Sequence, residues 1–374
     1  MAKILIVGHP TSPLEQARGL VGQRAGHQIY WFSVPQANLP NVVAFSIPRF
    51  VQQWSFIRTL LKPFFLYLVL KKVRPDIVHV HYAQTGLMAF LLKGFHPLVV
   101  TVMGGDILPD QEYHGLSSFF IRLLLDHTDC ITSKSEFMDA ALERIGNYRA
   151  KTRRVNWGID LDRFYPNKDV SALRVRWSIP PSDLVFFDSR LAKPFYNKHL
   201  ILEAFANYLK RGGASATLLV SEFFADPTYL AQLKKRARDL NIIDKVVFVG
   251  EISYDEMPDY YNLAEVTISV PPSDGLPQTI YEAFACGSFL ILSNLPQYAG
   301  IVEDKATACL VPVGDVNALT EALVWVSANP IIRQKAKEIS YSYVQENADF
   351  EKQALFVNRL YDELLQTYRT VKKE

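Results

Sequence analysis

Two acidic residues, Asp274 and Glu282, lie in the stretch SDGLPQTIYEAFACG, and seven residues separate them. Turn-forming residues surround Asp274, whereas a helical pattern of apolar residues surrounds Glu282. Pro277 suits the first position of that helix, because its φ is fixed and it has no amide to leave unpaired, and Gly287 suits the helix end. Free amides at a helix start bind anions, and carboxylates accept hydrogen bonds from hydroxyl groups. The stretch therefore predicts a ligand that carries both phosphate and hydroxyl groups, as a sugar nucleotide does.

An alternative without a ligand stays open for the same stretch. Asp274 can be a helix cap, and Glu282 can be a buried acid whose hydrogen bonds are satisfied within the protein. A Glu282 side chain turned into the interior would contradict the ligand hypothesis. A long distance between Arg190 and the helix start would also contradict it, because a phosphate needs a cation close to those amides.

Short apolar runs alternate with helical patterns along the chain, which is typical of parallel sheets with crossover helices. The runs lie at residues 3–7, 28–32, 76–81, 98–102 and 130–133, and then at 184–188, 216–220, 246–250, 266–270, 289–293 and 308–312. We therefore predict an α/β fold with two Rossmann-like, doubly wound domains in series. Ligands of such sheets bind at the carboxyl ends of the strands, so we expect the two domains to face a central cleft.

A turn-rich segment, NWGIDLDRFYPNK, separates the two series of strands. We place an N-terminal domain on the acceptor side at residues 1–160 and a C-terminal, donor-binding domain at 161–345. A final helical segment at 346–374 has apolar residues at helical spacing and can pack back on the N-terminal domain.

The composition excludes several classes of protein. The 374 residues carry a formal net charge of +2, which is far from the strongly basic character of a nucleic-acid binder. The three cysteines are too widely separated for a metal knuckle or a disulfide framework, which favours a reducing compartment. The apolar run at the N-terminus is too short for a signal peptide, and no uncharged run is long enough to span a bilayer. These features predict a cytoplasmic protein.

The opening stretch resembles the donor motif of the retaining GT-B glycosyltransferases of family 4. That motif has two acids, a Gly and a Pro after the first, and EA-x-A-x-G at the second; here Asp274 replaces the more frequent Glu. The resemblance implies that Asp274 and the backbone of Gly275, Leu276 and Pro277 face the donor sugar. It also implies that Glu282 holds the ribose.

Another segment, DSRLAKPFYNKHLILEAF, resembles the part of the family in which an Arg and a Lys bind the donor diphosphate. Arg190 matches the Arg, but Tyr196 and an Asn stand where the family has Lys-Gly. Lys198 or Lys193 can replace the missing Lys, and either one can instead be a solvated loop charge. VVFVGEISYDEMPDYYNLAEVTIS resembles the segment for the base, so Gly250 and the backbone after it are expected to pair with the base edge. The segment NWGIDLDRF also resembles the linker of this family.

Three residues of the first half are candidates for the acceptor side. His9 follows the first strand in GHPTSP, where it is an acceptor contact or a turn residue. His81 ends the strand HVHY and shares a face with His79, and the spacing suggests no third ligand for a metal. Asp106 follows two glycines in TVMGGDILPD, where the family often has a His at the position of Met103. We expect Asp106 to orient a substrate hydroxyl; the alternative is a helix cap or loop anchor.

The stretch FIRTLLKPFFLYLVLKKVRPD, residues 56–76, is apolar and aromatic and carries several basic residues. It is a core helix with basic ends, or a helix that lies on an anionic membrane surface. In the second case the protein is peripheral at the inner face of the membrane and its acceptor is lipid-linked.

Taken with the resemblance, these residues predict a metal-independent glycosyltransferase of polysaccharide biosynthesis, with Asp106, Arg190 and Asp274 as catalytic residues. It moves a hexose-type sugar from a nucleoside-diphosphate sugar to a hydroxyl of a glycan, lipid-linked or small-molecule acceptor, and it needs no cofactor besides that co-substrate. Arg190 and the helix start near Pro277 stabilise the leaving diphosphate. Two alternatives stay open: a catalytically silent partner subunit, which Met103 and the missing Lys-Gly favour, and a sugar-nucleotide epimerase of the same architecture.

Overall fold

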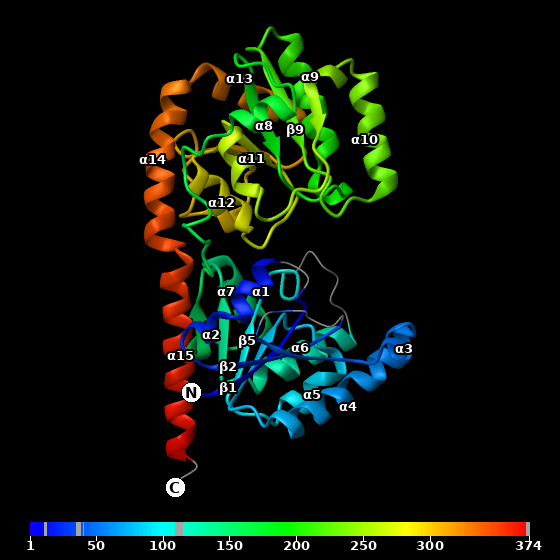
Figure 1. The fold of residues 1–374 in the computed structure, drawn as a ribbon, viewed down its shortest axis with the longest axis vertical. Helices are drawn as coiled ribbons and strands as arrows, with labels where there is room; N and C mark the ends of the chain where they lie inside the picture. Colours follow the sequence, from blue (N-terminus) through cyan, green and yellow to red (C-terminus); the bar gives the residue numbers. More distant parts are fainter. Residues whose placement is uncertain (11–12, 35–38, 40, 109–114, 372–374) are drawn as a thin grey trace. The chain divides into compact units, whose positions relative to one another are not determined.

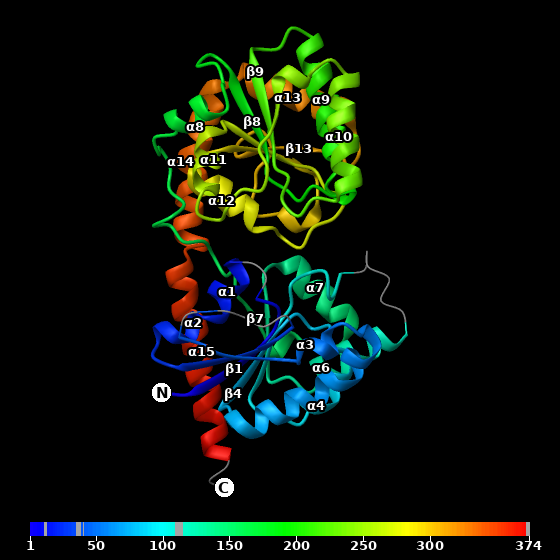
Figure 2. The same cartoon turned by 45° about the vertical axis from the view of Figure 1, so that its right-hand side comes forward.

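The computed structural model describes residues 1–374 except 11–12, 35–38, 40, 109–114 and 372–374. The chain forms two compact units (Figures 1 and 2). Met1–Trp157 and Glu351–Glu374 make up unit 1, and Gly158–Phe350 makes up unit 2. The unit boundaries thus lie after Trp157 and Phe350, where the sequence analysis placed them after residues 160 and 345.

Unit 1 contains a parallel sheet, in which the described strands follow the order β3-β2-β1-β4-β5-β6-β7. Buried aliphatic side chains pair in register at its centre, for example Ile4 with both Ile29 and Ile77. The strands are β1 (Lys3–Val7), β2 (Gln28–Ser33), β3 (Val43–Ser46), β4 (Ile77–His81), β5 (Leu98–Thr101), β6 (Cys130–Ser133) and β7 (Thr152–Arg154).

Helices cover both faces of the sheet in unit 1. On one face Val7 and Val80 share a core with residues of the long helix α4, such as Leu66. On the other face Asn358 of α15 donates to the carbonyl of Val21 at 3.3 Å. The helices are α1 (Pro13–Gly19), α2 (Val21–Arg24), α3 (Arg49–Gln52), α4 (Ser55–Val73), η1 (Gly86–Met88), α5 (Ala89–Leu92), α6 (Leu116–Asp126), α7 (Glu136–Ile145), η2 (Arg149–Lys151) and α15 (Phe350–Val371).

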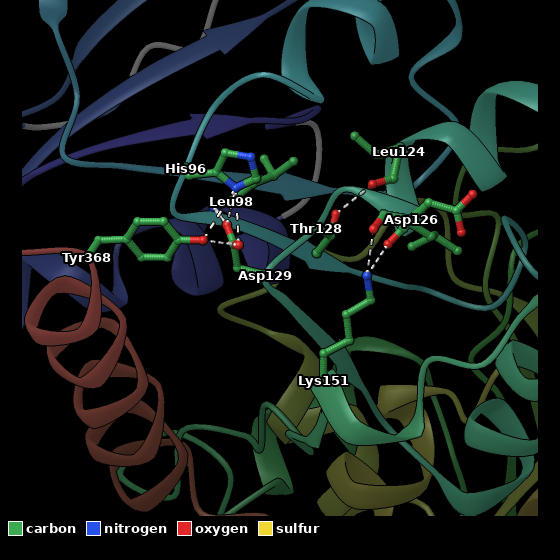
Figure 3. Close-up of polar contacts among 9 residues, drawn as sticks. His96, Leu98, Leu124, Asp126, Thr128, Asp129, Lys151 and Tyr368 are labelled. Carbon is green, nitrogen blue, oxygen red and sulfur yellow. Dashed lines mark hydrogen bonds and ion pairs between the residues drawn. The ribbon is translucent and has the colours of Figure 1, made fainter. Parts of the chain in front are cut away.

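The C-terminal helix α15 makes further polar contacts with residues of unit 1 that are far away in the sequence. The Tyr361 hydroxyl lies 2.6 Å from Nδ1 of the buried His79. Near the end of α15, the Tyr368 hydroxyl donates to Asp129, and its ring stacks on His96 with centroids 5.9 Å apart (Figure 3). Asp129 also accepts from the Leu98 amide at 2.7 Å. The last helix therefore completes the fold of the first unit.

Unit 2 contains a second parallel sheet, with the described strands in the order β10-β9-β8-β11-β12-β13. The strands are β8 (Leu184–Asp188), β9 (Ala216–Val220), β10 (Val246–Phe248), β11 (Val266–Ser269), β12 (Phe289–Ser293) and β13 (Ala308–Val311). The helices are α8 (Ser171–Arg176), η3 (Pro194–Tyr196), α9 (Lys198–Lys210), α10 (Pro227–Asp239), η4 (Ile243–Lys245), α11 (Met257–Leu263), α12 (Gln278–Cys286), η5 (Pro296–Tyr298), α13 (Val316–Ala328) and α14 (Pro330–Asn347).

The segment that starts unit 2 needs glycine at position 158. Gly158 has φ +57°, and a Cβ there would lie 2.6 Å from the carbonyl oxygen of Ala348. The two passing segments are also hydrogen-bonded: the Ile159 amide donates to Ala348 at 2.8 Å, and the Phe350 amide donates to Ile159 at 2.9 Å. A side chain at position 158 would push these segments apart, so their close approach requires glycine at this position.

The predicted fold class is confirmed, since each unit is a doubly wound parallel sheet. All the predicted strands are present, within two residues at their ends. Two edge strands, β3 and β7, were not predicted. β3 is partly exposed, and β7 has the polar sequence TRR, so neither strand is a buried apolar run. Among the described residues, no helix is both long and apolar enough to cross a membrane.

Candidate active site

Each sheet has one point where the strand order reverses, between β1 and β4 in unit 1 and between β8 and β11 in unit 2. Ligands of doubly wound sheets bind beyond the carboxyl ends of the strands at such a point. Gly8 and His9 follow β1, and His81 ends β4. Arg190 follows β8, and Asp274 lies in the loop after β11. The topology therefore brings these five residues to the switch point of their own unit, whereas Asp106 follows β5 and Gly250 follows the edge strand β10.

Arg190 and Asp274 form an ion pair at the switch point of unit 2. Arg190 Nη2 lies 2.9 Å from Asp274 Oδ2, and the two side chains are 11% and 10% exposed. The guanidinium also lies over the ring of Tyr196, 4.7 Å from its centroid. Burial lowers the pKa of Arg190, but the opposing effects of the Asp274 charge and of Tyr196 outweigh it, so the net pKa is raised. Arg190 therefore stays a fixed cation beside the loop that leads to α12.

The loop around Asp274 is held by contacts other than a helix cap. Asp274 Oδ1 accepts from the Gly275 amide at 2.8 Å, and the Tyr298 hydroxyl lies 3.5 Å from Oδ2. Helix α12 begins at Gln278, so Pro277 is the residue before the helix rather than its first residue. The expectation for Pro277 was wrong by one position, and Asp274 does not cap α12. The alternative reading of Asp274 as the helix cap is thereby excluded.

Leu276 gives this loop an unusual backbone. Its φ is +65°, although its side chain is 1% exposed and apolar. A branched residue in the left-handed region costs on the order of 1 kcal/mol or more, and such strain is concentrated at functional sites. Leu276 is followed by Pro277 and then by the first residue of α12. That its backbone faces the donor, which the resemblance implies, stays a prediction.

Glu282 is more enclosed than the ligand hypothesis expected. It is 6% exposed, and its Oε2 accepts from the Tyr261 hydroxyl at 3.0 Å. The same hydroxyl lies 3.1 Å from Oγ of Ser189, at the end of β8. Glu282 is thus buried and hydrogen-bonded within the protein, as the alternative without a ligand describes. The short distance between Arg190 and the α12 loop, in contrast, agrees with the ligand hypothesis. The ribose-binding role of Glu282 stays a prediction.

Lys198, one candidate for the missing phosphate-binding Lys, is buried in an ion pair. Its Nζ lies 2.8 Å from Asp188 Oδ2, and both side chains are 1% exposed. Burial lowers the pKa of Lys198, and the Asp188 charge opposes that shift. Burial likewise raises the pKa of Asp188, against the effect of Lys198. Asp188 Oδ1 also accepts from the Arg190 amide at 3.2 Å, so Lys198 supports the strand end that carries Arg190.

The remaining donor-side candidates have open surroundings. Lys193 is exposed in the loop between β8 and α9. Gly250 follows β10 with φ +76°, and a Cβ there would meet nothing within 4 Å. Its carbonyl accepts from the Glu222 amide at 2.9 Å, which ties the loops after β9 and β10 together.

A cavity of about 180 Å³ lies at the switch point of unit 1. His9 is exposed at its edge, and His81, 5% exposed, lines it together with Lys62 of α4. Both ring nitrogens of His81 and the buried hydroxyl of Thr85 lack a hydrogen-bond partner within the part of the chain that the structure describes. Buried polar atoms without a partner are costly, so these groups favour a polar ligand in the cavity. Thr11 and Ser12 of the GHPTSP loop lie outside the described residues.

His79 and His81 lie on the same face of β4, as their spacing predicted, with ring centroids 4.5 Å apart. His79 is satisfied within the protein: Tyr361 contacts Nδ1, and the Thr101 hydroxyl lies 2.7 Å from Nε2. Burial lowers the pKa of His79 to about 3. Burial, then His79 and Arg18, lower the pKa of His81 well below its ordinary value. Both rings are therefore neutral at physiological pH.

Asp106 has the geometry of a loop anchor. It is 0% exposed, and its Oδ1 accepts from the amides of Met103 and Gly104 at 2.9 Å each. Its Oδ2 accepts from the Ala83 amide at 2.7 Å. Burial raises the pKa of Asp106, and these backbone hydrogen bonds oppose the rise. The contacts favour the alternative role over direct contact with a hydroxyl, because both oxygens are engaged by the backbone.

Several residues of the site were not singled out as ligand or support residues, among them three tyrosines and a glutamine of unit 2. Tyr261 links β8 to α12, Tyr196 packs on Arg190, and Tyr298 and Gln297 of η5 contact Asp274. Gln297 and Tyr298 follow β12, so their position after a strand end was the signal that could have found them. Tyr261 lies in the middle of a helix, where the sequence carries no comparable signal.

Two family models match consecutive parts of the chain. The model described as Glycosyltransferase Family 4 matches residues 8–163, and the model described as Glycosyl transferases group 1 matches residues 171–343. The chain belongs to the family 4 glycosyltransferases. The two matched segments correspond to units 1 and 2, and the second contains Arg190, Asp274 and Glu282.

Curated and solved relatives agree with this family. The D-inositol 3-phosphate glycosyltransferase 2 of Catenulispora acidiphila is 26% identical over 63% of this chain, and the match spans 58% of the relative, a little over half of its length. An Escherichia coli enzyme named UDP-Gal:alpha-D-GlcNAc-diphosphoundecaprenol alpha-1,3-galactosyltransferase is 22% identical over 79% of this chain and 78% of its own. The sucrose-phosphate synthase of Thermosynechococcus elongatus superposes with a TM-score of 0.80 at 20% identity, over 98% of this chain and 100% of that one. This GT-B likeness shows the fold.

Proposed function

We propose that the protein is a retaining glycosyltransferase that moves a hexose from a nucleoside-diphosphate sugar to a hydroxyl acceptor. The observation that carries the proposal is the Arg190–Asp274 pair, 2.9 Å apart and about one-tenth exposed, at the switch point of unit 2 and with Asp274 in the loop that leads to α12. A cation and helix-start amides suit a diphosphate, while a carboxylate suits sugar hydroxyls. Both kinds of group are therefore present where one donor needs them.

The proposed reaction breaks the bond between the anomeric carbon and the phosphate oxygen. A new bond forms between that carbon and the acceptor oxygen on the same face of the sugar, and the acceptor proton passes to the leaving diphosphate. Arg190 would offset the charge that develops on the leaving group, and the amides of α12 would add to it without a metal. Losing one such preorganised partner typically costs about 10²–10³-fold in kcat.

The acceptor in this proposal binds in unit 1, at the cavity that His81 and Thr85 line. The unpartnered polar atoms of those two side chains support a hydroxylated ligand there. Asp106 acts as a positioning residue, because it holds the backbone of the loop after β5. We further propose a lipid-linked or glycan acceptor and a place at the cytoplasmic face of a membrane, because the name of the Escherichia coli relative contains a lipid diphosphate.

The test starts with the purified chain and a panel of nucleoside diphosphates and their sugars in a thermal-shift screen. A ligand that binds only the native state raises the melting temperature, which identifies the donor. Transfer from that donor to a lipid or sugar acceptor is then measured for the parent and for Arg190→Ala, with Arg238→Ala on the exposed face of α10 as the matched control.

We expect a loss of about 10²–10³-fold in kcat for Arg190→Ala and none for the control. Conversion of the donor to its epimer without an acceptor would overturn the proposal in favour of an epimerase. Donor binding without turnover of any acceptor in the panel would overturn it in favour of a silent subunit. Equal rates in Arg190→Ala and the parent would reject the role of the pair.

A further inference from the structure

The outer face of α4 is apolar, although it faces solvent. Its exposed side chains recur every three or four residues: Phe56 (76% exposed), Ile57 (42%), Leu60 (51%), Phe64 (54%), Tyr67 (44%) and Leu68 (45%). The opposite side of the helix packs into the core of unit 1 through Leu66, Val69 and Val73. A surface helix normally presents polar residues to water, so this helix is apolar on both sides.

The apolar surface continues beyond α4. Trp54, directly before the helix, is 65% exposed, and Phe90 of α5 and Phe119 of α6 are 49% and 50% exposed. The rings of Phe90 and Phe119 lie 6.2 Å apart, and η1, which leads into α5, packs against both α4 and α6. We call the outer face of α4 with these three residues the aromatic face. Contiguous exposed apolar surface of this kind marks an interaction site.

Basic groups lie on and around the aromatic face. Lys71 Nζ is 5.6 Å from the centroid of the Tyr67 ring, and Lys93 Nζ is 5.7 Å from that of Phe90. The sequence contains no Asp or Glu from residue 16 to residue 75, whereas it has Arg or Lys at 18, 24, 49, 58, 62, 71, 72 and 74, the last six of them in α3, α4 and directly after α4. Aromatic side chains next to cations are what a surface needs to enter the interface of a bilayer that contains anionic lipids.

We propose that the aromatic face docks on an anionic lipid bilayer. A second copy of the chain fits this face poorly, because a symmetric dimer places the same patch on both subunits and would bring these cations opposite one another. Lipid phosphates complement the cations, and the acyl boundary accepts the aromatic rings. Helix α4 lies along the surface and does not span the membrane, since among the described residues no helix can do so.

The same helix connects the aromatic face to the cavity of unit 1. Lys62 lies between Leu60 and Phe64 in the sequence, but it points to the other side of α4 and lines the cavity. Burial, then Arg58, lower the pKa of Lys62. A lipid-linked acceptor could therefore place an anionic head group near Lys62 while its tail stays in the bilayer. This last step rests on the proposed function, whereas docking itself needs no sugar transfer.

The test is flotation of the purified chain with large unilamellar vesicles of pure phosphatidylcholine or of phosphatidylcholine with phosphatidylglycerol. We expect binding to the anionic vesicles only, and less of it as salt is raised. The double variant Phe56→Ser/Phe64→Ser should lose at least tenfold in bound fraction, and Lys71→Glu/Lys72→Glu should lose binding as well. The matched control is Val175→Ser/Ile331→Ser in unit 2, whose side chains are 78% and 71% exposed; it should bind like the parent.

Further measurements separate the possible failures. Far-UV circular dichroism and the melting temperature check that each variant is folded, and the response to nucleoside diphosphate in the thermal-shift assay should be the same in parent and Phe56→Ser/Phe64→Ser. Docking without any donor response would reject the proposed function and leave the docking surface intact. A parent that binds neither vesicle, or a control variant that loses as much binding, would overturn the docking proposal. Sedimentation velocity showing a dimer that the Phe variant abolishes would assign the face to a second copy instead.

Discussion

The buried ion pair between Lys198 and Asp188 leads to the sharpest prediction, because it distinguishes a structural Lys from a phosphate-binding one. Both side chains are 1% exposed and 2.8 Å apart. Lys198→Met keeps the length of the side chain but leaves the carboxyl group of Asp188 buried without its cation. Removing one partner of a buried pair costs about 3–5 kcal/mol. For a unit of this size that corresponds to a melting temperature lower by roughly 6–20 °C.

The assay is differential scanning calorimetry of the full chain at neutral pH. Asp188→Asn/Lys198→Met should lose clearly less than Lys198→Met alone, because it removes the uncompensated charge while the Asn oxygen can still accept from the Arg190 amide. The matched control is Lys193→Met, an exposed Lys in the loop that leads to α9, which should change stability by no more than about 0.5 kcal/mol.

Nucleoside-diphosphate affinity is measured on the same variants below their unfolding temperatures. If Lys198→Met kept the parent's melting temperature but lost the diphosphate, Lys198 would be a ligand of the donor and our interpretation of the buried pair would be refuted. If Lys193→Met lost the diphosphate, that exposed Lys would be the missing cation of the family motif.

Two further predictions concern the acids and the buried histidines. In a calorimetric titration, Glu282→Ala should weaken donor binding more than Asp106→Ala does. Asp106→Ala should mainly lower the melting temperature, because three backbone amides lose their acceptor. Equal donor affinity in Glu282→Ala and the parent would reject the ribose role of Glu282. Burial lowers the pKa of His79 to about 3, so the unfolded chain binds a proton more readily than the folded chain does. The free energy of unfolding should therefore fall as the pH drops from about 6.5 towards 3. The expected slope is roughly 1.4 kcal/mol per pH unit for each buried neutral His. His81→Phe should make the dependence of the melting temperature on pH less steep, and an unchanged slope would contradict the assignment of His81 as neutral in the fold.

The two acids of the opening stretch show how far local pattern carries. The turn residues around Asp274 and the helix around Glu282 were predicted correctly, since both depend on residues close in the sequence. The partners of the acids were only partly predictable. Arg190 was expected near the α12 loop because the family resemblance implies that it binds the donor diphosphate. The Tyr261 hydroxyl that contacts Glu282 comes from a helix whose orientation is set by packing, so it was not predicted.

Edge strands and exposed helices were the hardest features to predict. The central strands are continuous apolar runs because both of their faces are covered. β7 reads TRR, since its position at the edge of the sheet requires no apolar run. The stretch at residues 56–76 is apolar all round, so its pattern could not distinguish a core helix from a surface helix. In the structure one side of α4 is buried, and the side with Phe56 and Phe64 is not.

The sequence by itself determined the doubly wound fold, the order of its central strands along the chain and the positions of Arg190 and Asp274 after strand ends, because periodicity and turn chemistry are local properties. Only the tertiary structure decided what those side chains meet. It buried Lys198 against Asp188 and enclosed Glu282 under Tyr261, and it turned the aromatic side of α4 to solvent. Burial and pairing depend on which helices cover each sheet, and that choice is made by contacts between residues far apart in the chain.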